Sequence, residues 1–173
     1  MPEDVDPLAG RVLGDYRVGA RLGAGAMGEV YRASHVRLDR EVALKVLRAA
    51  GEVHPDLAAR FQREGELQGR LVHAGLVRVF DVGATEGVRW IAMELVSGST
   101  LAHYIDRSAP HPLDFLVPAG QVMAGALACL HAARIVHRDL KPPNVLIGDD
   151  GLAQRDLASL VISASPAPRP ARS

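Results

Sequence analysis

The run Ile135-Val-His-Arg-Asp-Leu-Lys-Pro-Pro-Asn-Val-Leu-Ile147 constrains this chain more than any other feature of its sequence. Within it, Asp139, Lys141 and Asn144 are spaced so that one loop can present a carboxylate, an ammonium and an amide together. The carboxylate can accept the proton of an attacking hydroxyl, the ammonium can neutralise a transferring phosphoryl group, and the amide oxygen can bind Mg²⁺. An ordinary polar loop rarely carries the whole pattern, so the run indicates phosphoryl transfer.

A glycine-rich segment, Gly23-Ala-Gly-Ala-Met-Gly28, fits the pattern G-x-G-x-x-G. Glycines allow backbone N–H groups to approach phosphate oxygens without a Cβ in the way. Dinucleotide-binding folds use the same pattern, and a merely flexible hairpin also fits it. A dinucleotide site needs a helix that opens at the third glycine. Because Glu29-Val-Tyr-Arg-Ala33 keeps a two-residue alternation instead, we expect the glycines at the tip of a β-hairpin.

Two charged residues fall where apolar side chains are expected. Val42-Ala-Leu-Lys45 alternates as a strand does, which places Ala43 and Lys45 on one face. Glu64 lies on a stripe of helical spacing whose other members are Leu57, Phe61, Leu67 and Leu71. Burying either charge alone is costly, so we expect the two to meet, with the lysine also reaching a phosphate. The alternative is a pair of side chains whose charged ends reach water at the edge of the core.

Composition narrows the class of protein. The 173 residues include 20 basic and 20 acidic ones, and this zero net charge gives no support to nucleic-acid or anionic-membrane binding. The single cysteine, Cys129, excludes an intramolecular disulfide and suits a reducing compartment. No apolar run reaches the roughly 18 residues of a membrane span, and the acidic start is not that of a signal peptide. We therefore expect a soluble, cytoplasmic protein without a membrane segment.

Hydrophobic periodicity predicts a strand-rich half followed by a helical half. The predicted strands are 16–22, 29–34, 41–47, 76–82, 88–94 and, late in the chain, 145–147. The predicted helices are 55–73, 100–107 and 113–133, the last with Pro118 near its first turn. Residues 1–14 are expected to be a flexible lead-in, and the Ser/Ala/Pro/Arg-rich end, residues 163–173, is expected to be disordered.

In combination these features resemble a eukaryotic-type (Hanks-type) serine/threonine protein kinase of the bacterial branch, over about residues 16–151. The most similar segments are Leu22–Tyr31, Phe61–Glu64 and Val136–Asn144. The resemblance implies an α+β, protein kinase-like fold with a five-stranded antiparallel N-lobe carrying one helix, and an incomplete, mainly helical C-lobe. The expected parts are a lead-in (1–15), an ATP-binding N-lobe (16–97), a partial C-lobe with the catalytic loop (98–158) and a disordered tail (159–173).

The resemblance also implies roles for single residues and the cofactors ATP and Mg²⁺. Asp139 would be the catalytic base, Lys141 would favour Ser/Thr hydroxyls of a protein substrate, and Asn144 would bind Mg²⁺. Lys45 would hold the α- and β-phosphates, paired to Glu64, while His137 and Arg138 would be structural. The remaining ATP-binding positions comprise the glycine turn, the adenine-sandwiching side chains, the gatekeeper and the hinge: Leu22, Gly23, Gly25, Gly28, Val30, Ala43, Leu146, Met93, Glu94 and Val96.

The sequence departs from the family pattern after the catalytic loop, because it contains no Asp-Phe-Gly triplet, whose aspartate binds Mg²⁺. That aspartate is expected near position 157, and the nearest acid is Asp156, in Asp156-Leu-Ala158. We therefore expect a C-terminally truncated kinase of weakened activity that depends on a partner or chaperone. One alternative is a catalytically dead pseudokinase fragment acting as a nucleotide-binding or interaction module, and another is an unfolded remnant.

Overall fold

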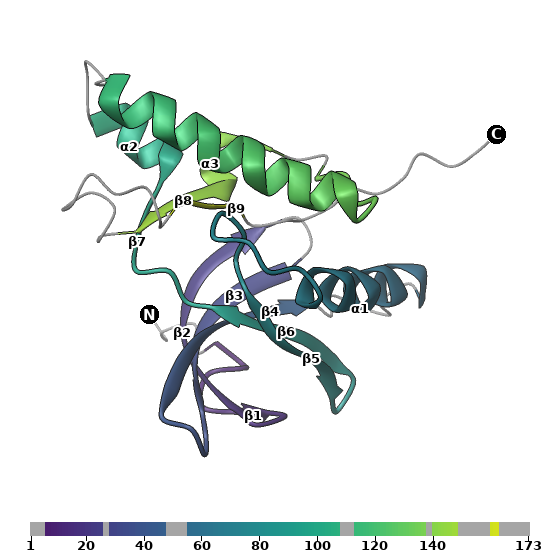
Figure 1. Ribbon diagram of the computed structural model, residues 1–173. Coiled ribbons are helices and arrows are strands. Elements are labelled where there is room, and N and C mark those ends of the chain that lie inside the picture. The colour runs from purple at the N-terminus through teal and green to yellow at the C-terminus, as the bar shows by residue number, and fades with distance from the viewer. Residues whose placement is uncertain are drawn as a thin grey trace. The chain divides into compact units, whose positions relative to one another are not determined.

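The computed structural model describes residues 6–25, 28–47, 55–107, 113–137, 140–148 and 160–162. The chain divides into two compact units. The first unit comprises Met1–Gly69 and Val79–Leu95, and the second comprises Arg70–Arg78 and Val96–Ser173. Figure 1 shows the first unit as a curved sheet with one helix, and the second as two helices with a small sheet.

The sheet of the first unit is antiparallel throughout, with strand order β1-β2-β3-β4-β6-β5. Its strands are β1 (Val12–Leu13), β2 (Tyr16–Gly25), β3 (Gly28–His35), β4 (Arg40–Leu47), β5 (Val79–Thr85) and β6 (Val88–Glu94). Five of these are the strands expected from the sequence, with longer or shifted ends. The antiparallel N-terminal sheet is therefore confirmed.

Strand β1 is an addition, and it lies in the segment expected to be a flexible lead-in. Val12 and Leu13 pair with Arg17 and Tyr16 of β2, and Leu13 is fully buried in the core. The reversal between the strands needs Gly14, which has φ +60°. For residues 12–13 the lead-in prediction was wrong, because two residues are too few to show periodicity and a glycine turn returns them to the sheet.

The two faces of this sheet have different partners. On one, which we call the core face, Leu13, Tyr31, Leu44, Trp90 and others form the main apolar cluster. The opposite face carries Leu47, Ile91 and partly buried Met93, and helix α1 (Pro55–Gly69) packs on it. We call this opposite face the site face. The alternation of side chains along each strand separates the two sets.

The sequence predicted a helix here correctly, but only part of the stripe that it predicted to be buried is buried. Leu57 and Leu67, expected inside, are each 37% exposed, and Leu71 lies beyond the end of the helix. Phe61 is buried as expected, and the other buried residues of the helix are Ala58 and Gly65. A Cβ at Gly65 would lie 2.9 Å from both Ile91 Cδ1 and Val82 Cγ2, so the helix approaches the sheet through its small residues.

The second unit contains α2 (Leu101–Arg107), α3 (Leu113–Ala132), the short 3₁₀ helix η1 (Pro142–Asn144) and an antiparallel sheet in the order β7-β8-β9. Its strands are β7 (Gly98–Thr100), β8 (Val145–Gly148) and β9 (Leu160–Ile162). Ala119 of α3 packs against Val145 and Ile147 of β8. Pro118 lies in the second turn of α3 rather than the first, so the helix lacks one backbone hydrogen bond there.

Three boundaries expected from the sequence differ in the structure. Residues 76–78, expected in a strand of the first unit, belong to the second, where Leu76 packs with Ala126 and Leu130. The units part after Leu95 rather than after residue 97. Strand β9 lies within the stretch expected to be a disordered tail. Leu160-Val-Ile162 is an apolar run with two β-branched residues, and it pairs with β8. The rest of residues 159–173 lies outside the described residues.

In the described part of the chain, no helix is both long and apolar enough to cross a membrane.

Candidate nucleotide-binding and catalytic site

Four residues expected to bind ATP share the site face of the large sheet. Val30 pairs with Lys45 across β3 and β4, and Ala43 pairs with Met93 across β4 and β6. Cross-strand partners point to the same side of an antiparallel sheet, as do residues two apart on one strand. The structure therefore brings three apolar side chains and one ammonium to one surface, while Glu94, at the exposed end of β6, pairs with Val42.

The ammonium of Lys45 is desolvated and has an acidic neighbour. Burial lowers the pKa of Lys45, and the charge of the Glu64 carboxylate on α1 opposes this by raising it. The Nζ atom also lies 5.9 Å from the centre of the Phe61 ring, a geometry that permits a cation–π contact. The two charges found at apolar positions of the sequence thus interact electrostatically within the first unit, one on α1 and the other on β4.

Phe61 is a member of this site that sequence reasoning assigned only to the apolar stripe. Its contact with Lys45 follows from the packing of α1 on the sheet. One signal in the sequence could have found it, because Phe61 and Glu64 are three residues apart and therefore share a helix face. A sheet lysine that approaches Glu64 can therefore contact Phe61 as well.

The glycine-rich segment closes the β2–β3 hairpin, as its alternation predicted. Gly25 pairs with Gly28 as the last pair of the ladder, and Ala26 and Met27 lie outside the described residues. At Gly28 a Cβ would overlap the carbonyl oxygen of Val46, so the fold itself requires glycine there. At Gly23 a Cβ would meet nothing within 4 Å. Neither close packing nor a positive φ therefore explains why position 23 is a glycine. The neighbouring Leu22 is 51% exposed.

The second unit holds the remaining expected residues. Lys141 is exposed and precedes η1, and Asn144 ends η1 with its N–H donated to the Lys141 carbonyl at 2.9 Å. Leu146 lies in β8, partly buried, opposite Thr100 of β7, and Val96 lies just after the boundary between the units. His137 is only 3% exposed, which suits a structural residue. Arg138 and Asp139 lie outside the described residues, and so does Asp156.

The expected Mg²⁺ ligands can be tested against these residues only in part. Asn144 supplies an amide oxygen at the end of η1, a donor that fits Mg²⁺. Among the described residues, no three His, Cys, Asp or Glu side chains come together as a metal site would require. Of the two residues expected to bind Mg²⁺, Asn144 and Asp156, only Asn144 lies in the described part of the chain.

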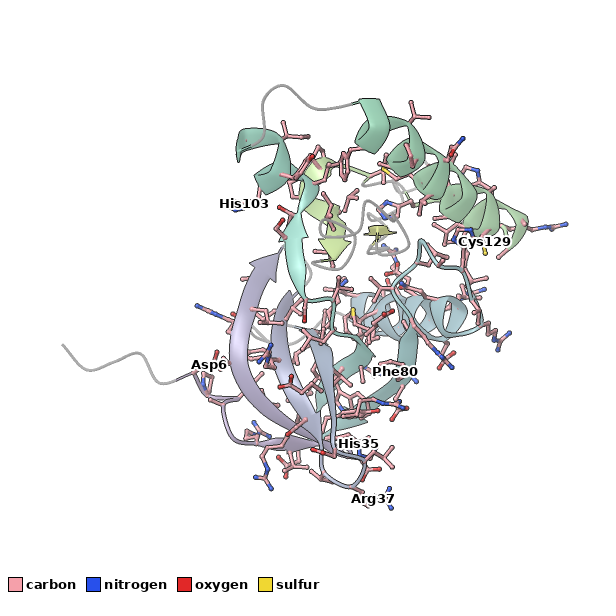
Figure 2. The ribbon with its side chains drawn as sticks, turned by 60° about the vertical axis from the view of Figure 1, so that its left-hand side comes forward. Asp6, His35, Arg37, Phe80, His103 and Cys129 are labelled. Atoms are coloured by element: carbon pink, nitrogen blue, oxygen red, sulfur yellow. The ribbon has the colours of Figure 1, made fainter. Side chains whose placement is uncertain are left out.

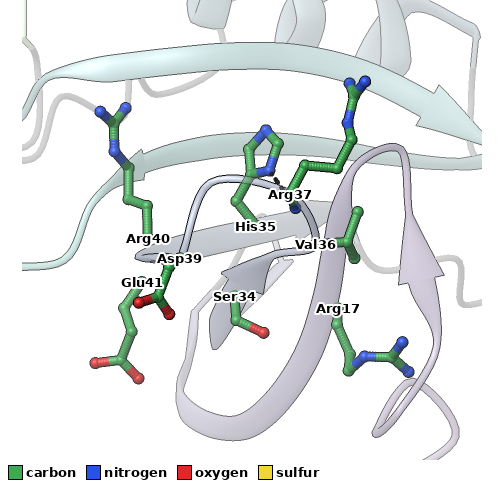
Figure 3. A pocket seen from close by; sticks show the side chains of 8 residues that line it. All are labelled: Arg17, Ser34, His35, Val36, Arg37, Asp39, Arg40 and Glu41. Carbon is green, nitrogen blue, oxygen red and sulfur yellow. Dashed lines mark hydrogen bonds between the residues drawn. The ribbon is translucent and has the colours of Figure 1, made fainter.

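A separate hollow of about 400 Å³ lies around the β3–β4 turn, at the opposite end of these strands from the glycine turn. Arg17, Arg37 and Arg40 line it, but their guanidinium groups point in different directions (Figure 3). Arg37 is paired with Asp15 at 2.7 Å, and Arg40 lies over the ring of Phe80 at 5.0 Å. The hollow therefore lacks a convergent set of donors for an anion and contains none of the residues expected to bind ATP.

Known proteins match most of this chain. Residues 16–156 match the family described as protein kinase domain. The chain is 39% identical over 164 residues to the serine/threonine-protein kinase PknL of Mycobacterium bovis, covering 92% of this chain and 41% of that protein. It is also 39% identical over 142 residues to the serine/threonine-protein kinase PrkC of Bacillus subtilis, covering 82% of this chain and 22% of that protein.

Solved structures give the same result for the fold. The crystal structure of the Mycobacterium tuberculosis PknI kinase domain superposes with a TM-score of 0.73 and 33% sequence identity, covering 90% of this chain and 60% of that one. The chain thus spans about two fifths or less of the two curated relatives named above and less than two thirds of the solved domain. The match over residues 16–156 and the shared α+β fold show that this chain belongs to the protein kinase domain family, among relatives of the bacterial Hanks-type serine/threonine kinases.

Proposed function

We propose that this chain binds ATP with Mg²⁺ and transfers the γ-phosphoryl group to Ser or Thr hydroxyls of a protein. The observation that carries the proposal is the desolvated Lys45 ammonium on the site face, with Glu64 as its counter-charge. Desolvating an ammonium is costly, and a single carboxylate only partly offsets that cost. An anionic phosphate beside Lys45 would supply the further compensation, because a compact ammonium is well suited to phosphate oxygens.

The neighbours of Lys45 support a nucleotide as the source of that phosphate. Val30, Ala43 and Met93 give the site face a small apolar surface against which the flat adenine base would pack. Gly23, open on its Cβ side, leaves its backbone accessible to phosphate oxygens at the hairpin. In this proposal Leu22, Gly25 and Gly28 complete the turn over the phosphates, and Glu94, Val96 and Leu146 complete the base site.

The proposal assigns the transfer step to the loop that carries Asp139, Lys141 and Asn144 in the second unit. Asp139 would accept the proton of the substrate hydroxyl as its oxygen attacks the γ-phosphorus, and Lys141 would neutralise charge on the transferring group. Mg²⁺, held in part by Asn144, would neutralise the phosphate oxygens when bound. The names of the relatives favour Ser/Thr over Tyr as the acceptor.

A second function, nucleotide binding without transfer, is favoured by one observation. The chain has no Asp-Phe-Gly triplet, and the acid nearest to the expected position, about 157, is Asp156, in Asp156-Leu-Ala158. If Asp156 does not hold Mg²⁺, charge stabilisation of the transfer step falls while Lys45, Glu64 and the glycine turn still retain ATP. In that case the chain would be a pseudokinase module.

One experiment separates the two functions. Purified chain is incubated with γ-labelled ATP, Mg²⁺ and a generic basic protein, beside Asp139→Asn and Lys45→Met variants. Its thermal shift with ATP is measured in parallel, since ligand that binds only the folded state raises apparent stability. Transfer that Asp139→Asn abolishes supports the kinase. An ATP shift that Lys45→Met removes, without transfer, supports the binding module. A folded chain that shows neither transfer nor an ATP-dependent thermal shift would refute both functions.

A further inference from the structure

The hairpin that carries the glycine turn is held together by side chains below the turn. Arg21 of β2 pairs with Glu29 Oε1 of β3 at 3.0 Å. The other carboxylate oxygen of Glu29 accepts a hydrogen bond from the Tyr31 hydroxyl at 2.9 Å. The Tyr31 ring is almost fully buried on the core face, the side opposite Lys45. A chain of three side chains therefore links the two strands from behind the proposed nucleotide site.

These links lie where the backbone pairing of the hairpin is irregular. The pairing of β2 with β3 shifts register between Val18 and Arg21, and again between Arg21 and Gly23. A register shift interrupts the regular hydrogen bonds and lets the strand bend. Since backbone pairing is irregular over this stretch, the Arg21–Glu29–Tyr31 links contribute more to the geometry of the hairpin there than they would in a regular ladder.

The same Tyr31 hydroxyl is also in contact with the N-terminal segment. It lies 3.0 and 3.1 Å from the two carboxylate oxygens of Asp6, and Asp6 Oδ1 accepts the N–H of Leu8 at 3.0 Å. Leu8 packs on the main core cluster, and the Gly10 N–H donates to the Val18 carbonyl at 2.9 Å. Figure 2 shows Asp6 beside the strands of the large sheet. The segment 6–13 is thus tied to β2 and β3 from outside the hairpin.

One hydroxyl proton serves two carboxylates in this arrangement. Tyr31 can donate to Asp6 or to Glu29 at any moment, while its oxygen faces both. Burial, together with hydrogen bonds to Glu29 and Asp6, raises the pKa of Tyr31, so the phenol keeps its proton. The hydrogen bonds from Tyr31 to Asp6 and to Glu29 therefore depend on one proton. Loss of the Asp6 contact changes the Tyr31–Glu29 hydrogen bond next to the glycine turn.

We propose that Tyr31 is a positioning residue that couples attachment of the N-terminal segment, through Asp6, to the geometry of the glycine turn and hence to the affinity for a nucleoside triphosphate. This inference rests on the proposed nucleotide-binding function. Tyr31 acts through Glu29 and Arg21 and touches no ligand, because its ring faces the side of the sheet opposite Lys45.

The test uses Tyr31→Phe, which keeps the ring in the core and removes only the hydroxyl. The matched control is Tyr16→Phe, the same chemical change at another buried tyrosine of the same core cluster. Two quantities are measured for each protein: amide hydrogen exchange without ligand, and the ATP dissociation constant by calorimetry. Tyr31→Phe should raise exchange at residues 21–25 and 28–30 selectively, with helix α3 unchanged, and should weaken ATP binding by about fivefold.

Asp6→Ala gives an independent variant at the less buried end of the link. It leaves the Tyr31 hydroxyl proton to Glu29 alone, so ATP binding should be as tight as in the wild type or tighter. In the Tyr31→Phe background the same change should have no effect on ATP binding, because no hydroxyl is left to share. ATP binding that is equal in wild type, Tyr31→Phe and Tyr16→Phe would overturn this inference and leave the proposed function intact. If the folded wild-type chain binds no ATP, the proposed function fails first. A rise in exchange spread over the whole chain would show a structural role only and refute the coupling.

Discussion

Gly65→Ala should destabilise the first unit, although alanine is the better helix former. Inside a helix, this change ordinarily stabilises by about 1 kcal/mol. At Gly65, however, the added Cβ would lie 2.9 Å from Val82 Cγ2 and 2.9 and 3.0 Å from two carbons of Ile91. Both neighbours are β-branched side chains of a paired sheet, with few rotamers available to move aside. Overpacking of this kind costs about 1–3 kcal/mol, which leaves a net loss of about 1 kcal/mol.

The same change should also affect the site, because Glu64 is the neighbour of Gly65 on α1. Relief of the clash requires α1 to move away from the sheet, which takes the Glu64 carboxylate away from Lys45. The pKa of Lys45 should then fall further, since burial persists while the opposing charge recedes. ATP affinity should therefore drop together with stability.

Gly69→Ala is the matched control at the end of the same helix. A Cβ there would lie 3.7 Å from Val79 Cγ1, an ordinary contact, so this variant should be neutral or more stable by up to about 1 kcal/mol. Urea unfolding followed by the emission of Trp90, the single tryptophan, reports on the first unit because Trp90 is buried in its core. If Gly65→Ala proves as stable as Gly69→Ala, the close approach of α1 to the sheet is refuted.

Three further predictions concern stability and pH. Gly14→Ala should destabilise the first unit by more than about 1 kcal/mol in the same urea assay, because φ at Gly14 is +60° and a Cβ would overlap the ring of Trp90. Gly87→Ala is the control for backbone strain alone, since Gly87 has φ +81° and a Cβ there would have no neighbour within 4 Å. Leu130→Ala should cost the second unit about 2–5 kcal/mol by far-ultraviolet circular dichroism, because Leu130 is fully buried against Leu76 and Ala126; an unchanged transition would contradict that packing. Lys45 has a lowered pKa in the folded chain, so between that pKa and about 10.4 the unfolded chain binds more protons than the folded one. Over this pH range the free energy of unfolding of the wild type should therefore rise with pH relative to that of Lys45→Met, by at most about 1.4 kcal/mol for each pH unit. Parallel pH profiles of the two proteins would refute the lowered pKa.

Much of the first unit could be predicted because its signals are local. Alternation along 41–47 predicts β4 and places Ala43 and Lys45 on one face, and the structure has them there. The glycine hairpin follows from alternation that continues past Gly28. Lys45 and Glu64 could be matched from sequence because each is a charge at an apolar position. Such conflicts stand out in a sequence, and burial makes them costly unless they are resolved together.

Other features depended on partners distant in sequence. Leu76 belongs to an apolar run that is typical of a strand of the first unit, yet it packs against Leu130, and both residues belong to the second unit. The face of α1 was misjudged because hydrophobic periodicity gives weight to Leu57 and Leu67, whereas the sheet admits Ala58 and Gly65. Strand β1 is too short for any periodic signal. Shape complementarity between elements decides these cases, and it is not encoded in a local pattern.

The sequence by itself determined the family of this chain and the chemistry to be expected of it, because phosphoryl-transfer motifs need particular residue types at particular spacings along one loop or one strand. Only the tertiary structure decided which groups surround them. It brought Phe61 next to Lys45, set Gly65 against Ile91, and joined Asp6 to Glu29 through one buried hydroxyl. Those contacts join elements far apart in the chain, and their geometry follows from packing, which is a property of the folded molecule as a whole.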